Sequence, residues 1–408
     1  ILVDEFQDTN FIQNKWLNLL VNDKENICCV GDDDQSIYSW RGAEIKNFLE
    51  FDKIYENTKI IRLEENYRST QNILSVASEL ISNNKKRVGK TLRTNSNEGD
   101  LIKLNCFRNG KDEAIGLSDE IENKLKKDYS LNNIAILVRA IFQTREFEER
   151  FLKIGLPYRI VGGTKFYERA EIKDCVAYLR IIYQKKDDLS FERILNVPKR
   201  SIGDTTLKLI NETAKKNSFS LEEASKFLIE MNKIKPKTKI GLTSLLSLLD
   251  KWRVDLNIKK INHIKLLQLV LDESGYSQML KNKKDLENEN RLENIKELLN
   301  AMKEFDNLEN FLEHVALATS LDQNWQSEKV NLMTMHSSKG LEFDVVFLPG
   351  WEEGLFPHQK SIEEKGENGL EEERRLAYVG ITRAKKIANI SFSMNRFYQG
   401  DWMDSMAS

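Results

Sequence analysis

The sequence has few cysteines, no long hydrophobic run and almost no net charge. Of its four cysteines, Cys28 and Cys29 are adjacent, and Cys106 and Cys175 stand apart without the spacing of metal ligands. This excludes a zinc site and is typical of reduced thiols inside the cell. No apolar run approaches the roughly 20 residues of a membrane helix, and no basic, apolar leader is recognisable. We therefore expect a cytoplasmic protein without membrane contact.

Length and charge leave the class of partner open. The 408 residues suffice for two or three domains with sizeable cores. The formal net charge of −2 neither supports nor excludes nucleic acid, because phosphate contacts need a local track of basic residues rather than a basic total.

Apolar runs that end in polar loops predict α/β architecture near the start of the chain. Ile1–Val3 lead into the acidic pair Asp4 and Glu5, Ile27–Val30 precede an acidic loop, and Ile60–Leu63 repeat the pattern. In such folds, ligands bind at the loops that follow the strands.

The rest of the chain changes from an α/β pattern to a helical one and back. Ser69 is expected to cap a helix, and a strand at Ile134–Ala140 and a helix at Thr144–Ile154 follow. Strand-like runs are absent between residues 171 and 326, which predicts a helical insertion, and they resume after Lys329. The polar stretch "HQKSIEEKGENGLEEE" is expected to be a mobile surface loop.

The first candidate site is the pair Asp4 and Glu5. A carboxylate at a strand end can hold Mg²⁺, and a second beside it can accept a proton from water that attacks a terminal phosphate. Most Asp-Glu pairs are solvated loop residues, but this pair directly follows an apolar strand. The position favours a metal–nucleotide site.

The second candidate is "VGDDDQSIYSWRGA", which sets Gln35, Tyr38, Trp40 and Arg41 within seven residues after a strand. An amide can contact a phosphate oxygen, and aromatic rings can stack on bases. Taken alone, the stretch also fits a turn packed by its own tryptophan.

Three further blocks join cations to polar turns. "LEENYRS" sets Tyr67 beside Arg68, whose planar guanidinium fits phosphate oxygens. "MTMHSSKGLEFDVVF" links two strands through a turn that contains His336, and "EEERRLAYVGITRAKK" is a helix that carries arginines. Taken singly, these blocks also fit a surface ion pair, a structural histidine and a solvated charged helix.

Together the five blocks, with a helical insertion between the third and fourth, resemble motifs II to VI of superfamily 1 DNA helicases of the UvrD, PcrA and Rep type. The resemblance covers nearly the whole chain, including "GLPYRIVGGTKFYERAEIKD" and "VPKRSIG". It implies an α/β fold with two RecA-like P-loop NTPase domains, the first truncated, and an all-helical domain inserted in the second. The implied bounds are 1–62 for the C-terminal part of the first domain, 63–168 and 328–408 for the second, and 169–327 for the insertion.

The resemblance also implies ATP and Mg²⁺ as cofactors. In such helicases, ATP binds between the two RecA-like domains. By matching position, Asp4 would hold Mg²⁺, Glu5 would activate the attacking water, Gln35 would sense the γ-phosphate, Arg68 and Arg383 would stabilise the transferred group, Tyr67 would stack on adenine, and Glu342 would bind the ribose.

The partners that the resemblance implies are single-stranded DNA and junctions between single- and double-stranded DNA. The matching DNA-binding positions are Tyr38, Trp40, Arg41, Lys165, Ile202, Gly203, His336, His358 and Tyr398. Two departures stand out. Ser201 replaces the first glycine of the family's Gly-Ile-Gly loop, and Arg139-Ala140-Ile141 stands where relatives usually carry Arg-Thr-Asn.

No stretch matches the phosphate-binding loop G-x-x-x-x-G-K-[ST]. The nearest, "NKKRVGKT" from Asn84, lacks the first glycine and follows a predicted helix rather than a strand, so we do not interpret it as this loop. In relatives the loop lies before the position of Asp4, and we expect that both ends of the chain are cut.

We therefore predict an ATP-dependent 3′-to-5′ DNA helicase that unwinds duplex DNA in repair or replication restart, with repair proteins as further partners, acting as a monomer or weak dimer. The 408-residue chain alone is expected to be inactive. Two alternatives stay open: a standalone, non-enzymatic product that binds DNA or a partner, and part of a helicase–nuclease of the RecB or AddA type.

Overall fold

The computed structural model describes residues 1–408 except 22–25, 56, 91, 283–285, 321–327 and 399–400. Two compact units divide the chain: residues 1–163 with 327–408 form the first, and residues 164–326 form the second. Among the described helices, none combines the length and the apolar character needed to cross a membrane.

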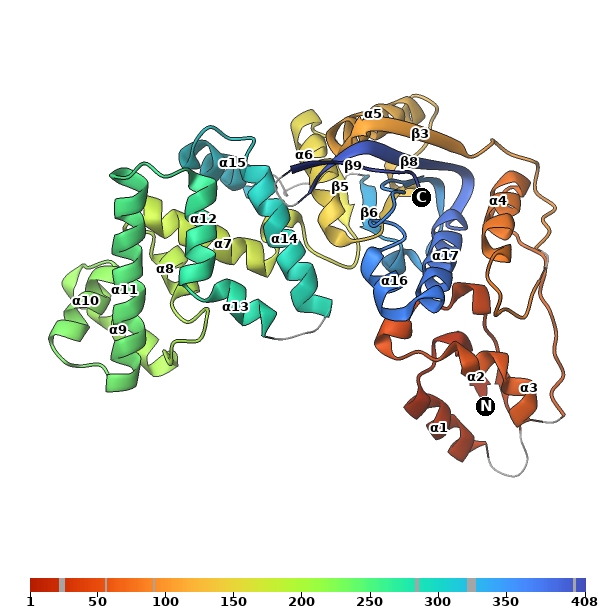
Figure 1. The fold of residues 1–408 in the computed structure, drawn as a ribbon, viewed down its shortest axis with the longest axis horizontal. Coiled ribbons are helices and arrows are strands. Elements are labelled where there is room, and N and C mark those ends of the chain that lie inside the picture. The colour runs from red at the N-terminus through yellow and green to blue at the C-terminus, as the bar shows by residue number, and fades with distance from the viewer. Residues whose placement is uncertain (22–25, 56, 91, 283–285, 321–327, 399–400) are drawn as a thin grey trace. The chain divides into compact units, whose positions relative to one another are not determined.

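The first unit is built on a parallel sheet of six strands (Figure 1). In spatial order the strands are β3 (Lys103–Asn109), β8 (Ala384–Tyr398), β7 (Phe343–Leu348), β4 (Ile134–Val138), β6 (Val330–Thr334) and β5 (Tyr158–Ile160). A further strand, β9 (Asp401–Asp404), pairs antiparallel with β8. The predicted α/β fold is confirmed for this unit, including the strands that resume after the helical region.

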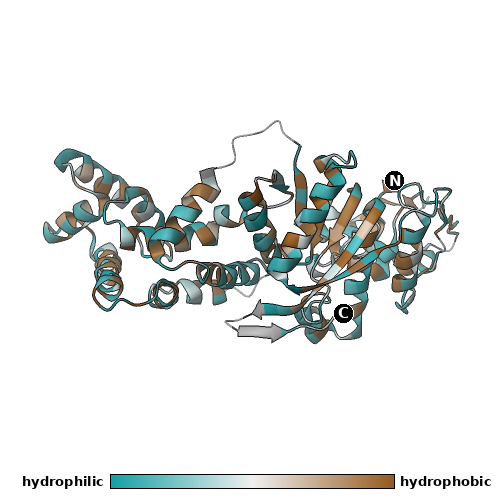
Figure 2. Cartoon of the chain, turned by 90° about the horizontal axis from the view of Figure 1, so that it is seen from above, coloured by the Kyte–Doolittle hydropathy of each residue, from teal (hydrophilic) through white to brown (hydrophobic). Residues whose placement is uncertain are grey.

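Both faces of this sheet are buried, which explains why its central strands are almost entirely apolar. The covering helices are α4 (Gln71–Ser82), α5 (Gly110–Leu125), α6 (Thr144–Ile154) and α17 (Glu367–Ile381). Along β4, Ala135 and Leu137 pack with α4 and α17, whereas Ile134, Ile136 and Val138 pack with α5 and α6. This alternation follows the two-residue period of a strand, and the central strands are brown in Figure 2.

The start of the chain forms a smaller element of the same unit. The apolar runs form the predicted strands β1 (Leu2–Val3) and β2 (Cys28–Cys29), which pair in parallel. Around them lie the helices α1 (Phe11–Leu20), α2 (Ile45–Leu49) and α3 (Phe51–Ile54), and the short 3₁₀ helices η1 (Phe6–Asp8), η2 (Asp33–Gln35) and η3 (Ser39–Arg41). Helix α1 begins in a capping box, in which Asn10 and Gln13 exchange side-chain and backbone hydrogen bonds.

The prediction of a strand at Ile60–Leu63 is wrong. These residues are irregular, and the side chains of Ile61 and Leu63 are 70% and 78% exposed. A strand requires a neighbour for its ladder of hydrogen bonds, and no described residue pairs with residues 60–63.

Two local predictions also need correction. Helix α4 has Thr70 rather than Ser69 at its N-cap, because the Ser69 hydroxyl donates to the Ala384 carbonyl at 2.6 Å. Residues 358–373 are not a loop but form α16 (Gln359–Lys365) and the first turns of α17. The side chains of Glu371, Glu372 and Glu373 in this stretch are buried against distant partners rather than solvated.

Among its described residues, the second unit contains helices joined by turns and no strand, as predicted for the insertion. Its helices are α7 (Ala170–Tyr183), α8 (Asp188–Ile194), α9 (Asp204–Asn217), α10 (Leu221–Glu230), α11 (Pro236–Asn257), α12 (His263–Glu273), α13 (Tyr276–Lys281), α14 (Leu286–Met302) and α15 (Leu308–Ser320). Ser220 and Glu223 form a capping box at α10, and Pro236 stands in the first turn of α11. Trp252 is fully buried in this unit, and its Nε1–H donates to Glu273 at 2.8 Å.

A buried charge cluster joins α5 to strand β8. Arg396 donates to Glu113 at 2.6 Å and to both carboxylate oxygens of Glu352 at 2.6 and 2.9 Å. The Ser391 hydroxyl and the Gly350 N–H complete the shell of Glu113. Each carboxylate therefore has its hydrogen-bond acceptors occupied, which is what allows two acidic side chains to be buried.

We predict that Arg396→Met destabilises the first unit by about 3–5 kcal/mol, because it leaves two buried carboxylates without their cation. Lys386→Met is the matched control, because Lys386 is an exposed lysine of the same strand, β8, that pairs with Asp344 of β7, and losing this pair should cost less than about 1 kcal/mol. Urea denaturation followed by tryptophan fluorescence measures both. Equal effects of the two substitutions would show that the cluster is not needed for stability.

Candidate functional site

The acidic pair lies directly after β1, in a tight turn. Glu5 has a left-handed backbone, with φ of 51°, and its N–H donates to Asp4 Oδ1 at 2.9 Å. Both side chains are exposed. Buried Gln7 donates to Glu5 Oε2 at 2.6 Å and accepts from the Asp32 N–H at 3.0 Å. Gln7 thus joins the loops that follow β1 and β2, a role that no sequence pattern indicates.

Lys339 contacts both of these loops. Its ammonium lies 3.1 Å from Glu5 Oε2, pairs with Asp8 and donates to the Gln35 carbonyl at 3.0 Å. The pKa of Asp8 is raised by burial, which the hydrogen bond from Lys339 opposes. Lys339 is missed among the predicted site residues, although it lies in the quoted "MHSSKGLEF" turn.

Arg383 is the buried cation of the site, lying between the end of α17 and the start of β8. Its guanidinium donates to the carbonyls of Val379 and Leu341 at 3.0 and 3.2 Å, and to Gln35 Oε1 at 3.4 Å. Burial, and then the positive charge of Arg68, lower its pKa to about 10. Among the described residues, none forms an ion pair with Arg383, so its charge is left for an anion.

Arg68 and Glu342 lie beside Arg383 because backbone contacts join their segments. The Thr70 N–H donates to the Lys385 carbonyl at 3.2 Å, and the Phe343 N–H donates to the Arg383 carbonyl at 2.9 Å. Arg68 Nε donates to Glu342 Oε2 at 2.9 Å, and Lys385 Nζ lies 2.7 Å from Glu342 Oε1. Hydrogen bonds from Lys385 and Arg68 lower the pKa of Glu342.

The ring of Tyr67, beside Arg68, is 83% exposed. An exposed ring at the rim of this group of cations can offer a face to a flat, aromatic ligand.

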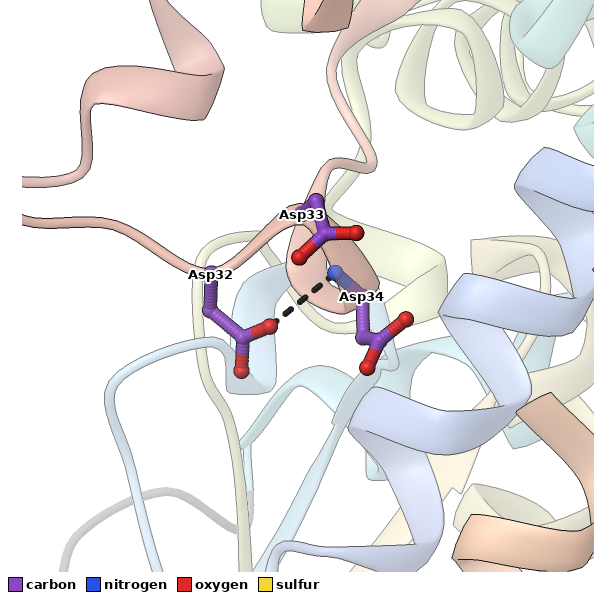
Figure 3. A group of neighbouring side chains, drawn as sticks. All are labelled: Asp32, Asp33 and Asp34. Atoms are coloured by element: carbon purple, nitrogen blue, oxygen red, sulfur yellow. Dashed lines mark hydrogen bonds between the residues drawn. The ribbon is translucent and has the colours of Figure 1, made fainter. Parts of the chain in front are cut away.

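Three adjacent carboxylates, Asp32, Asp33 and Asp34, form the acidic loop after β2 (Figure 3). Their oxygens lie close enough to hold a metal ion, but protein donors contact them. Arg87 binds Asp34 through two hydrogen bonds of 3.0 and 2.7 Å, and the Val88 N–H donates to Asp33 at 2.8 Å. Burial raises the pKa of Asp33, the hydrogen bond from the Val88 N–H opposes this, and the charges of Asp34 and Asp32 add to the rise.

A cluster of rings and one cation combines the second candidate motif with the turn after β6. Tyr38, Trp40 and His336 have ring centroids 6.2 to 6.4 Å apart, and the Arg41 guanidinium lies 4.6 Å from the Trp40 ring centroid. The Tyr38 hydroxyl donates to the His336 carbonyl at 3.2 Å. We call these four residues the aromatic cluster. Burial, with Arg139 and Arg41 nearby, lowers the pKa of His336 to about 3.

His358 lies at the start of α16, where its N–H donates to Glu373 at 2.9 Å. Arg139 pairs with the same Glu373 through two hydrogen bonds of 2.9 and 2.7 Å. The sequence differs from the family's Arg-Thr-Asn at Ala140 and Ile141, but its arginine, Arg139, is present and forms this ion pair with Glu373.

Three predicted DNA-binding residues belong to the second unit. Lys165 precedes the short helix η6 (Phe166–Glu168), and Gly203 is the exposed N-cap of α9. Ile202 is 4% exposed, so its side chain anchors the loop rather than reaching outward. Ser201 keeps a left-handed backbone, with φ of 61°, where the family's loop has glycine. The side chain of Tyr398, at the end of β8, lies outside the described residues.

These features define a doubly wound α/β protein with a helical unit inserted between two strands of its sheet. Comparison with known protein families identifies the family to which this protein belongs. Residues 61–395 match the family described as the UvrD-like helicase C-terminal domain, and residues 1–56 match the UvrD/REP helicase N-terminal domain. The chain belongs to the UvrD/REP helicase family.

Named relatives match over almost the whole chain. A probable DNA helicase II homolog of Rickettsia felis is 49% identical over 98% of the chain, and DNA helicase II of Escherichia coli is 42% identical over 98%. The ATP-dependent DNA helicase PcrA of Staphylococcus aureus is 40% identical over 100% of the chain. The chain spans 62%, 56% and 57% of the lengths of these three relatives.

We predict that His336 makes stability depend on pH. Its pKa is about 3 in the folded chain against an ordinary 6.5, so between these values the unfolded chain binds more protons. The contribution of this group is therefore complete above about pH 6.5 and falls as the pH drops toward about 3, by at most about 1.4 kcal/mol per pH unit.

His336→Gln cannot titrate, so urea denaturation should show a smaller loss of unfolding free energy between about pH 7 and about pH 4. Between about pH 7 and about pH 8, the variant and the parent chain should have equal slopes. The same acid dependence in both chains would contradict a neutral imidazole in the folded chain.

Proposed function

We propose that the full-length protein to which this chain corresponds is an ATP-dependent DNA helicase. It moves 3′-to-5′ along single-stranded DNA and unwinds duplexes in DNA repair or replication restart. The relatives' names, DNA helicase II and ATP-dependent DNA helicase PcrA, support the ATP-dependent helicase activity in this proposal. Residues 1–62 would belong to the first RecA-like domain, 63–168 and 328–408 to the second, and 169–327 to the helical insertion.

The contact between Gln35 and Arg383 is the observation that supports nucleotide chemistry best. It joins the loop after β2 to the segment between α17 and β8, at a distance of 3.4 Å. Arg383 is 2% exposed and has no carboxylate partner among the described residues, and Arg68 adds a second positive charge close by. Arg68 is partly exposed and paired with Glu342, whereas Arg383 is buried without a carboxylate partner in the described part of the chain. A polyphosphate would offset the burial of Arg383 and the repulsion between the two guanidinium groups, so the pair fits a site for such an anion.

The residues present also fit Mg²⁺ and ATP. Asp4 offers an exposed carboxylate, the ligand type that Mg²⁺ prefers, and the bound ion would supply charge neutralisation for the phosphates. Glu5 would accept the proton of the attacking water, Gln35 would orient toward the terminal phosphate, and Arg68 and Arg383 would stabilise its developing charge. Tyr67 would stack on the base and Glu342 would bind the ribose.

The aromatic cluster is the proposed contact with single-stranded DNA. Trp40 is 44% exposed and the Arg41 guanidinium lies on its ring, so together they offer a stacking face and a positive charge. Lys165, His358 and Tyr398 are further proposed contacts, and the loop of Ile202 and Gly203 is proposed to meet the duplex at a junction. Stacking depends little on base identity, which suits a motor that must move along any sequence.

We predict that Trp40→Ala weakens binding of a fluorescent oligothymidylate by about 5- to 150-fold, the equivalent of about 1–3 kcal/mol for one stacked base. Fluorescence anisotropy at fixed salt concentration measures this, because phosphate contacts depend strongly on salt. Trp16→Ala is the matched control, since Trp16 is a 60% exposed tryptophan on α1 outside the cluster. If both variants bind like the parent chain, the aromatic cluster is not the contact.

We predict that Arg383→Ala in the full-length protein lowers kcat for DNA-stimulated ATP hydrolysis by about 10³- to 10⁵-fold. Arg374→Ala, a neighbour on α17 whose side chain contacts Asn84, should leave kcat within about twofold because it changes no group of the site. The 408-residue chain alone should show no turnover above background. ATP hydrolysis by this chain that Glu5→Gln abolishes would contradict that expectation.

A further inference from the structure

Residues 84–90 of the segment "NKKRVGKT", which resembles a phosphate-binding loop without being one, lie against the acidic loop after β2. Lys90 pairs with Asp32 and lies 3.5 Å from Asp34 Oδ2, and its side chain is 17% exposed. Its ammonium is also 5.7 Å from the ring centroid of Tyr378 on α17. The lysine of this Gly-Lys pair therefore binds carboxylates of the protein itself.

Asp32 in turn holds the amide of Gln35. Gln35 Nε2 donates to Asp32 Oδ2 at 2.8 Å, while Gln35 Oε1 accepts from Arg383 at 3.4 Å. A carboxylate only accepts and a guanidinium only donates, so these two partners define which side of the amide carries the nitrogen. Because the amide group is planar, the hydrogen bond to Asp32 also fixes the direction of the second N–H of Gln35 Nε2. This second N–H is the group that can donate to a phosphate oxygen.

Lys90 has a different task from its neighbours in the segment. Arg87 binds Asp34 with two hydrogen bonds, and Asn84 and the Lys85 N–H bind Glu371 of α17 at 2.9 Å each. These contacts are enough to hold the segment in place without Lys90. Lys90 is the cation on Asp32, the one acidic residue of the loop that also bonds to Gln35.

Charge explains why Asp32 needs this cation. The three carboxylate side chains offer oxygens within 4.8 Å of one another, and like charges this close repel. Without Lys90, Asp32 would lie next to two other carboxylates with no ammonium beside it, and of the described donors only the Asp34 N–H, at 3.0 Å from Asp32 Oδ1, and the Gln35 amide would still hold its side chain. We therefore expect Asp32 to be less firmly placed, which would loosen the acceptor that fixes the Gln35 amide.

We propose that Lys90 is a positioning residue of the nucleotide site: by holding Asp32 it fixes the Gln35 amide between Asp32 and Arg383, ready to donate to the terminal phosphate. The inference rests on the proposed function, because it assigns Gln35 the task of contacting that phosphate. It also gives the second proposed domain, which contributes Lys90, a direct part in arranging a loop of the first.

Hydrogen–deuterium exchange of the 408-residue chain tests the contact without any activity. Lys90→Gln should speed exchange of the backbone amides of residues 32–36 by about tenfold, and Lys90→Arg should restore slow exchange because it keeps the charge. Lys85→Gln is the matched control, because Lys85 lies in the same segment as Lys90 but forms an exposed ion pair with Glu367 of α17. Unchanged exchange in Lys90→Gln would overturn the proposal.

Steady-state kinetics of the full-length protein test the consequence. Lys90→Gln should lower kcat for ATP by about 10- to 100-fold, as expected for a misplaced catalytic group, with KM within about twofold, and Lys90→Arg should recover most of the loss. Faster exchange with unchanged kcat, or a loss that appears only in KM, would overturn the positioning role. An inactive parent protein would instead refute the proposed function itself, while the exchange experiment would still decide whether Lys90 orders the loop.

Discussion

The parallel register between β7 and β8, which sets Phe343 opposite Ala384, is the constraint on which the site depends. Glu342 and Arg383 are the residues directly before these two strands, so the register places them side by side. The hydrogen bond from the Ser69 hydroxyl to the Ala384 carbonyl then brings Arg68 to the same edge. Three residues that are far apart in the sequence meet because this pairing holds at the start of the two strands, before the ladder shifts its register between Phe343 and Val345.

The proposed nucleotide site and the proposed DNA site lie at opposite ends of the strands of the same sheet. One turn connects the two ends. Arg139 and His336 follow β4 and β6 at the carboxyl ends of the strands, whereas Glu342 and Arg383 precede β7 and β8 at the amino ends. The turn from His336 to Glu342 runs from one edge to the other, and Lys339 lies within it, in contact with Glu5 and Gln35. A displacement of this turn would therefore move residues of both proposed sites.

Sequence patterns predict the buried parts of this fold well and its long-range contacts poorly. Ile134–Val138 is a run of apolar residues and forms a fully buried strand, and the helix Thr144–Ile154 begins and ends as its periodicity indicates. The strand prediction for Ile60–Leu63 is wrong because a strand forms only where a second segment pairs with it, and the sequence of one segment does not reveal whether such a partner exists.

The acidic stretch around Glu373 fails for a related reason. Its composition suggests solvation, but its partner Arg139 lies 234 residues away. The same limit applies to the site. Asp4, Gln35 and Arg383 can be found from local motifs, whereas Gln7, Lys339 and Lys90 act through partners in other segments that no local pattern reveals.

The small sheet of β1 and β2 carries a further consequence for work with this chain. Among the described residues, β1 and β2 pair only with each other, and Leu2 is 86% exposed beside them. Ile61 and Leu63 form another exposed apolar stretch in the same unit. Open strand edges with apolar side chains are templates for pairing with other chains. Self-association of the purified polypeptide is therefore expected to begin at these exposed residues and to grow with protein concentration.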